Sequence, residues 1–155
     1  MIKLEKAIIS DAEEILLLQK LAYKSESELY NDFTIPPMTQ TLQSIRDEFG
    51  RQVFLKAMVD EKIIGSVRAF EQGETCYIGR LMVHPDHQCH GIGKKLMNEI
   101  ENLFKSCKRF ELFTGSKSEK NLRLYKNIGY EIFKTKKITD NVTLVYLEKT
   151  STNIQ

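Results

Sequence analysis

Residues 81–95 read LMVHPDHQCHGIGKK, a run that passes from a strand pattern into a helix pattern through a turn with two glycines. The first backbone N–H groups of a helix lack partners within the helix, and their positive partial charge attracts phosphate. Gly91 and Gly93 have no Cβ, so the main chain can approach a ligand closely. Lys94 and Lys95 add positive charge beside them. The stretch therefore predicts an anion-binding site between a strand and a helix.

Two well-known phosphate-binding patterns do not fit this turn. A mononucleotide P-loop requires glycine at the position of Gln88 and Ser or Thr at the position of Lys95. A dinucleotide-binding fingerprint requires a third glycine at the position of Leu96. What remains is a Gln-x-x-Gly-x-Gly pattern that follows a strand ending Leu-x-Val.

This pattern resembles the pyrophosphate-binding motif of the GNAT superfamily of acetyl-CoA-dependent N-acetyltransferases. Farther along, residues 118–130 read SEKNLRLYKNIGY and resemble the second signature of that superfamily, a helix that ends Leu-Tyr-x-x-x-Gly-Tyr. The resemblance covers most of the chain, although it is only an outline before Val53. It implies an α/β (α+β) fold in one domain, residues 1–150, with a mixed, mostly antiparallel twisted sheet of about seven strands flanked by about four helices. Residues 151–155 are expected to form a loose tail.

The bulk composition sets the class of protein. A chain of 155 residues with 41% hydrophobic residues can form one domain around a single core. Acidic and basic residues are mixed and the net charge is only +2, so we expect no nucleic-acid partner. No apolar run reaches the length of a signal peptide or a membrane span, which predicts a cytoplasmic protein without a membrane partner. Cys76, Cys89 and Cys107 are expected to be free thiols.

The hydrophobic period predicts the order of the elements. A strand at 2–8 precedes a helix that begins with a capping box at Ser10 and Glu13 and runs to about Lys24. Residues 25–39 are expected to be a loop with short helical pieces. The elements expected after it are a helix at 41–49, strands at 53–59, 63–70 and 75–83, a helix at 91–106, a strand at 109–114, a helix at 118–128, and a hairpin of 130–134 with 142–147. The helix at 91–106 should face the sheet with Ile92, Leu96, Ile100 and Leu103.

The resemblance further implies acetyl-CoA as cosubstrate and a site for it. The turn amides would bind the pyrophosphate, and the backbone of residues 81–83, in a strand that bulges and parts from its neighbour, would pair with the pantetheine amides. The alternatives are that Leu81 and Val83 are core residues and that Ser118 caps a helix. The residues expected at the cofactor are Leu81, Met82, Val83, Gln88, Cys89, His90, Gly91, Ile92, Gly93, Lys94, Ser118, Asn121 and Tyr125.

Tyr125 is the expected catalytic residue. By resemblance it protonates the departing CoA sulfur, and a tyrosine with a pKa near ~10 carries the required proton at neutral pH. The glutamates that several superfamily members use as general base are absent, because Tyr77 and Phe113 occupy those positions. Glu74, Glu111 and His84 lie nearby in sequence, but the base stays unassigned, with ordered water as an alternative.

The expected activity is transfer of the acetyl group to a primary amine of a small molecule or peptide by direct attack, without an acyl-enzyme. The alternative is a non-catalytic acyl-CoA sensor or regulatory module of the same fold, and a homodimer is left open. Glu26, Glu28 and Asp32 either attract the cationic amine or form a solvated helix face. The residues expected to line the acceptor site are Tyr30, Asn31, Phe33, Thr34, Ile35 and Pro36.

A metal site is not expected, although four potential ligands crowd into one loop. A closed zinc site takes its ligands from two separated segments, whereas these residues overlap the proposed phosphate turn. The four are His84, His87, Cys89 and His90.

Overall fold

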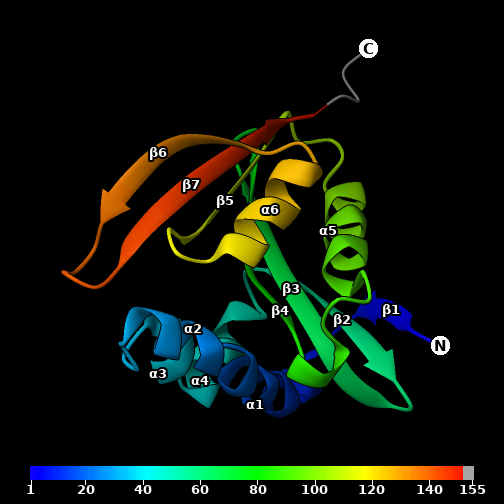
Figure 1. Cartoon of the computed structure of the whole chain (residues 1–155). Coiled ribbons are helices and arrows are strands. Elements are labelled where there is room, and N and C mark those ends of the chain that lie inside the picture. Colours follow the sequence, from blue (N-terminus) through cyan, green and yellow to red (C-terminus); the bar gives the residue numbers. More distant parts are fainter. Residues whose placement is uncertain (152–155) are drawn as a thin grey trace.

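One seven-stranded sheet organises the protein in the computed structural model, which describes residues 1–151 (Figure 1). The strand order is β1-β2-β3-β4-β5-β7-β6, and every neighbouring pair is antiparallel except β4 with β5. The predicted mixed, mostly antiparallel sheet is therefore confirmed. The strands are β1 (Lys3–Lys6), β2 (Val53–Val59), β3 (Lys62–Gln72), β4 (Thr75–Val83), β5 (Arg109–Gly115), β6 (Glu131–Lys137) and β7 (Thr143–Thr150).

Six α-helices and two short 3₁₀ turns accompany the sheet. The sequence predicts about four helices, and the difference arises because the irregular segment 25–39 contributes two short ones, α2 and α3. The α-helices are α1 (Ala12–Ala22), α2 (Lys24–Tyr30), α3 (Pro36–Thr39), α4 (Leu42–Glu48), α5 (Ile92–Leu103) and α6 (Glu119–Asn127). The 3₁₀ turns are η1 (Ile9–Asp11) and η2 (Pro85–His87).

The strands alternate between two hydrophobic cores, as a period of two requires. Leu55 and Ile64 face the larger core, where α5 and α6 pack against the sheet. Their neighbours Phe54 and Ile63 face the opposite core, which α1 and α4 cover. The two layers of helices thus lie on opposite faces of the sheet, and anything bound between α1 and α6 must pass the sheet at a gap between strands.

Two details of the predicted helices are wrong. No capping box forms at Ser10 and Glu13; instead the carboxylate of Asp11 accepts the N–H of Ile8 at 2.9 Å, and the first helix begins with η1. In α5, Leu103 is the last helical residue and is 39% exposed. Met97, which lies outside the predicted stripe, is fully buried in the same core as Ile92, Leu96 and Ile100.

Ser151, the first residue of the expected tail, pairs with the main chain before β5. Ser151, assigned to a loose tail, is buried, and its N–H donates to the carbonyl of Lys108 at 2.8 Å, which extends the pairing beyond β7. The other tail residues, 152–155, lie outside the described part of the chain. Among residues 1–151, none of the helices combines the length and apolarity that a membrane crossing requires.

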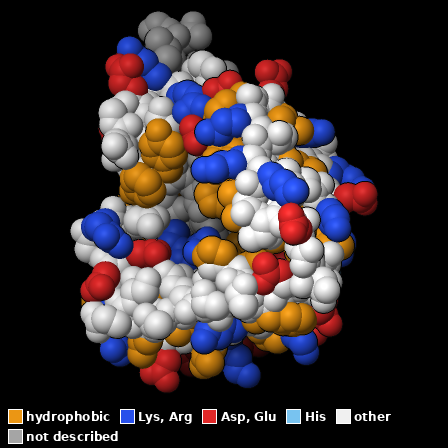
Figure 2. All heavy atoms as spheres, turned by 90° about the vertical axis from the view of Figure 1, so that its left-hand side faces the viewer, with side chains coloured by type: hydrophobic (Ala, Val, Ile, Leu, Met, Phe, Trp, Pro, Cys, Tyr) orange, Lys and Arg blue, Asp and Glu red, His pale blue; other side chains and the backbone are white. Residues whose placement is uncertain are grey.

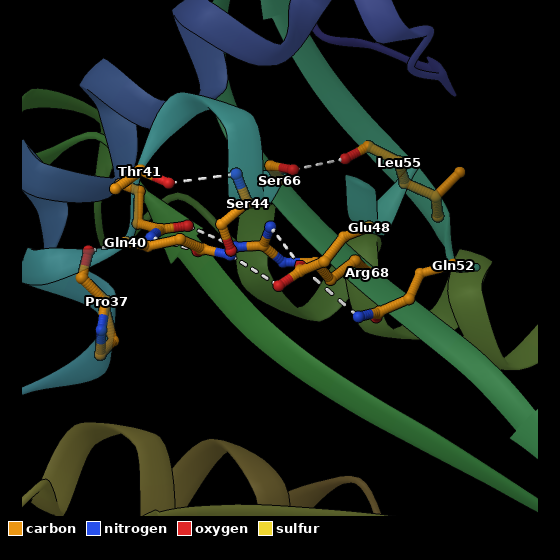
Figure 3. A network of polar contacts seen from close by, with 10 residues as sticks. Pro37, Gln40, Thr41, Ser44, Glu48, Gln52, Leu55, Ser66 and Arg68 are labelled. Atoms are coloured by element: carbon orange, nitrogen blue, oxygen red, sulfur yellow. Dashed lines mark hydrogen bonds and ion pairs between the residues drawn. The ribbon is translucent and has the colours of Figure 1, made fainter. Parts of the chain in front are cut away.

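A buried ion pair fixes α4 to the sheet. Arg68 of β3 is 2% exposed and pairs with the Glu48 carboxylate at 3.0 Å (Figure 3). Its guanidinium also lies over the ring of Phe54. The guanidinium also contacts the side-chain oxygen of Gln19, which is itself fully buried. Burial lowers the pKa of Arg68 to about 10, against the opposing effect of Glu48. Glu48 additionally accepts a hydrogen bond from Gln40 at 2.6 Å, so this carboxylate joins α4, β3 and the end of α3.

We predict that Glu48→Ala lowers the free energy of unfolding by about 3 kcal/mol, because removing one partner leaves a buried charge without compensation. Urea unfolding followed by circular dichroism measures the change. The neighbouring Asp47→Ala is the control: Asp47 is exposed and accepts only a surface hydrogen bond from Gln43, so its loss should cost less than about 1 kcal/mol. Equal destabilisation by the two substitutions contradicts the role given to the ion pair.

Candidate active site

The site begins where β4 and β5 part. The two parallel strands pair over only three residues each, Thr75–Tyr77 with Arg109–Glu111. Beyond that point β4 continues along β3 and β5 continues along β7, so in residues 1–151 the strands no longer pair with each other. A cavity of about 720 Å³ lies beside the freed end of β4. Figure 2 shows the side of the molecule at the left of Figure 1, where the surface is deeply hollowed.

A β-bulge redirects β4 just before the cavity. Ser66 of β3 pairs with Met82, but Arg68 pairs with Gly79, so Arg80 and Leu81 together lie opposite one residue of β3. Arg80 has φ of 51°, a left-handed conformation that a bulge accommodates. β4 therefore contains a bulge and separates from β5, as the sequence predicts for this strand.

The glycine turn leads from β4 into α5 and leaves the start of that helix open. Gly91 is the N-cap, with φ of 77°, and no side chain caps the helix. The first intrahelical bond runs from Lys95 N–H to Gly91 C=O at 3.1 Å, so the amides of residues 92–94 lack partners within the helix. Gln88 and His84 brace the approach: Gln88 donates to the Val83 carbonyl at 3.2 Å, and the Nδ1 atom of His84 accepts the N–H of Asp86.

The cavity brings together most of the residues expected at the cofactor. Two of that set do not line it: His90 is exposed on the turn, and Tyr125 is buried behind the wall. Lys117, Lys120 and Arg123 also line the cavity and were not predicted, because surface lysines and arginines on a helix carry no distinguishing pattern. The expected residues in the lining are Leu81, Met82, Val83, Gln88, Cys89, Gly91, Ile92, Gly93, Lys94, Ser118 and Asn121.

Two tyrosines of the helices next to the cavity differ in exposure, since Tyr23 is half-buried and lines the cavity, whereas Tyr125 is buried. The hydroxyl of Tyr23, at the junction of α1 and α2, donates to the Leu81 carbonyl at 3.3 Å. Tyr125 of α6 is 5% exposed, and burial raises its pKa above the ordinary value, with further increases from Tyr23 and Glu26. Burial likewise raises the pKa of Tyr23. Both phenols therefore carry their protons at neutral pH.

Ser118 does not cap α6 through its side chain, so the helix-capping alternative is wrong. Its hydroxyl donates to the Glu26 carboxylate at 2.7 Å and lies 2.8 Å from the hydroxyl of Tyr30. Asn121, one turn later on α6, donates to the same carboxylate at 3.4 Å. These contacts tie α2 to the start of α6 across the cavity.

The residues expected at the acceptor do not line this cavity. Tyr30 is buried and its hydroxyl accepts the N–H of Lys117 at 2.8 Å, so its role is to hold the loop between β5 and α6. Asn31 ends α2 in a left-handed conformation, and Thr34 donates to Asp32 on the surface. Phe33 is 54% exposed. Ile35 and Pro36 form the N-terminus of α3.

The residues at the superfamily's usual base positions, and the neighbouring candidates for a base, lie outside the cavity lining. Tyr77 stacks on Phe70, and Phe113 is 48% exposed beside Tyr146. Glu74 pairs with Lys108, while Glu111 pairs with Arg109. Neither these acids nor His84 lines the cavity.

The model of the Acetyltransferase (GNAT) family matches residues 17–130. The chain belongs to this family. As a member of the GNAT acetyltransferase family it has the predicted fold. The match extends from α1 to the end of α6 and includes the residues of the cavity wall.

The chain is also similar to one curated protein and to solved acetyltransferase structures. The chain is 27% identical over 133 residues to the UPF0157 protein YqkA of Bacillus subtilis (strain 168); the match takes in 86% of this chain and 38% of that protein's length. Among solved structures, the PaiA N-acetyltransferase of Thermoplasma acidophilum, in complex with coenzyme A, has a TM-score of 0.80 at 17% identity, covering 97% of this chain and 99% of its own. The ribosomal-protein-S18-alanine N-acetyltransferase of Escherichia coli has a TM-score of 0.82 at 12% identity, covering 100% and 99%. These structures establish the GNAT fold.

Gly115, at the end of β5, allows Tyr30 of α2 to pack closely against this strand. A Cβ at this position would lie 1.9 Å from the Tyr30 hydroxyl, so only glycine allows Tyr30 to reach Lys117 and Ser118. We predict that Gly115→Ala lowers the free energy of unfolding by about 1–3 kcal/mol, measured in urea.

Gly79→Ala on β4 is the matched control, because a Cβ there meets nothing within 4 Å. If Gly115→Ala is tolerated as well as Gly79→Ala, the close packing of Tyr30 against β5 is not a constraint on the fold.

Proposed function

We propose that the protein transfers the acetyl group of acetyl-CoA to a primary amine of a small-molecule or peptide acceptor. One observation carries the proposal: a single cavity joins the open amides of α5, the unpaired end of β4, and α6, the helix that carries the buried Tyr125. A thioester cofactor needs its phosphates bound, its pantetheine arm aligned, and its leaving thiolate protonated. The three features correspond to these three requirements in their order along the cofactor.

The cofactor would bind through backbone and charge. The α5 amides and Lys94 would take the pyrophosphate, since a helix start favours anions. Lys117, Lys120 and Arg123 add positive charge to the same cavity. The pantetheine amides would pair with the backbone of residues 81–83, as an added strand pairs with a free sheet edge.

The acetyl group would move by direct attack. The amine nitrogen bonds to the thioester carbon, the carbon–sulfur bond breaks, and the Tyr125 phenol gives its proton to the sulfur. An acyl-enzyme is disfavoured by the placement of the thiols. Cys76 and Cys107 are buried, which raises the pKa of each, and Cys89 lies in the turn proposed for the phosphates.

A second candidate function is acyl-CoA sensing without turnover. It is favoured by Tyr77 and Phe113, which occupy the positions where several superfamily members carry the basic glutamate. A panel of amines, monitored by release of CoA thiol, separates the two functions. Sustained thiol release with any one amine excludes a pure sensor.

We predict that the protein binds CoA more tightly than 1 mM in isothermal calorimetry and that Tyr125→Phe lowers kcat about 100-fold while CoA affinity stays within about threefold. The physical reason is that phenylalanine preserves the packing but removes the proton donor. Tyr146→Phe on β7 is the control and should change neither quantity, because Tyr146 packs against Phe113 and Phe133 outside the cavity.

Two results would contradict the proposal in different ways. CoA binding no tighter than millimolar removes the cofactor assignment. Unchanged turnover in Tyr125→Phe removes the role of Tyr125 but leaves the acetyltransferase assignment standing.

A further inference from the structure

Glu26 presents an acid to the cavity from α2. Glu26 and Glu119 are the acidic residues in the part of the lining that the structure describes, and they differ in setting. Glu119 is exposed at the first turn of α6, whereas Glu26 is half-buried and held by side chains of that helix. Glu26 lines the same cavity as Tyr23, and its charge raises the pKa of both Tyr23 and Tyr125.

A directed chain of hydrogen bonds ends on Glu26. The N–H of Lys117 donates to the Tyr30 hydroxyl at 2.8 Å, and the Ser118 hydroxyl donates to Glu26 Oε2 at 2.7 Å. Because the Ser118 proton is committed to Glu26, the 2.8 Å contact between Tyr30 and Ser118 must be donated by Tyr30. Every donor in the chain thus points toward the carboxylate. This arrangement favours the ionised form of Glu26, which is the form that accepts a proton.

The surroundings of Glu26 leave its charge without a counter-ion. Within residues 1–151, no ion pair joins Glu26 to a lysine or arginine. Burial raises the pKa of Glu26, and the Ser118 hydrogen bond opposes that rise. A half-buried carboxylate of this kind favours a cation beside it. The other titratable groups of the cavity and its wall are Tyr23 at the end of α1, Tyr30 of α2, His87 of η2, Lys94 of α5, Lys117 before α6, and Glu119, Lys120, Arg123 and Tyr125 of α6.

We propose that Glu26 is the general base that deprotonates the acceptor amine, held in place by Ser118 and Asn121. The proposal rests on the acetyltransferase function proposed above and supplies the group that the family's usual positions lack. Only about one molecule per thousand of an amine with a pKa near ~10 is neutral at pH 7, so the ammonium must lose a proton before it attacks, and Glu26 would accept that proton.

The protons balance across the reaction. The acceptor ammonium gives one proton to Glu26, and the freed nitrogen attacks the thioester carbon. As the nitrogen–carbon bond forms, the carbon–sulfur bond breaks and the sulfur takes the phenol proton of Tyr125. The second proton on nitrogen returns through solvent to the Tyr125 phenolate. Glu26 releases its proton to water, so the net products are the amide, CoA thiol and one proton.

The test compares Glu26→Gln with Glu28→Gln in an enzyme saturated with acetyl-CoA and amine. Glu28 lies on the same helix, is exposed, and is outside the cavity, so its substitution should leave kcat unchanged. Glu26→Gln should lower kcat about 100-fold, with CoA binding by calorimetry within about threefold of the wild type.

The pH profile separates a base from a structural or binding residue. In the wild type, kcat should fall as the pH drops through the pKa of Glu26, because the carboxylate must be ionised. Glu26→Gln should remove this acidic limb. Ser118→Ala should move the limb to higher pH, because the lost hydrogen bond had lowered the pKa of Glu26.

Three outcomes would overturn the inference. If Glu26→Gln keeps the wild-type kcat and acidic limb, Glu26 is not the base, although the acetyltransferase function stands. If the variant raises only KM and retains the limb, Glu26 merely binds the ammonium. If the wild type binds CoA but turns over no amine in the panel, the proposed function fails and the role of Glu26 fails with it.

Discussion

The whole arrangement depends on one interruption in backbone pairing. Buried N–H and C=O groups of a strand need partners, and the continuous sheet provides them almost everywhere. At the end of β4 the pairing with β5 stops after three residues, while the Arg80 bulge turns the strand away from its neighbour. A strand end left in this way can pair with the amides of an extended ligand. The α5 start lies at one end of that strand segment, Glu26 lines the same cavity, and Tyr125 is buried in α6, other residues of which line it.

Much of the fold could be predicted because its signals are local. The alternation of Phe54 and Leu55 between two cores defines a strand, and the turn at Asp60 and Glu61, both with positive φ, joins β2 to β3 as predicted. The glycine turn before α5 was likewise readable from spacing. The helical period of 3.6 did not predict every buried residue of α5. Leu103, predicted to face the sheet, is exposed, whereas Met97 is buried.

The site was predicted less completely because its polar contacts join distant parts of the sequence. Glu26 meets Ser118 across 92 positions, and Tyr30 meets Lys117 across 87. Neither pair has a spacing that a motif could record. The packing of Tyr30 against β5 also requires glycine at position 115, because a Cβ there would block the approach of the Tyr30 ring. The residues expected at the acceptor lie outside the cavity lining, at the end of α2, in the connection to α3 and at the start of α3; they are Tyr30, Asn31, Phe33, Thr34, Ile35 and Pro36.

A crystal structure with coenzyme A bound would show directly which backbone groups hold the cofactor. We expect the diphosphate at the amides of residues 92–94 and the pantetheine amides paired with the backbone of residues 81–83. We also expect the sulfur within hydrogen-bonding reach of the Tyr125 hydroxyl. Coenzyme A bound at another surface, or in the cavity with the end of β4 untouched, would show that the strand end is not the cofactor site.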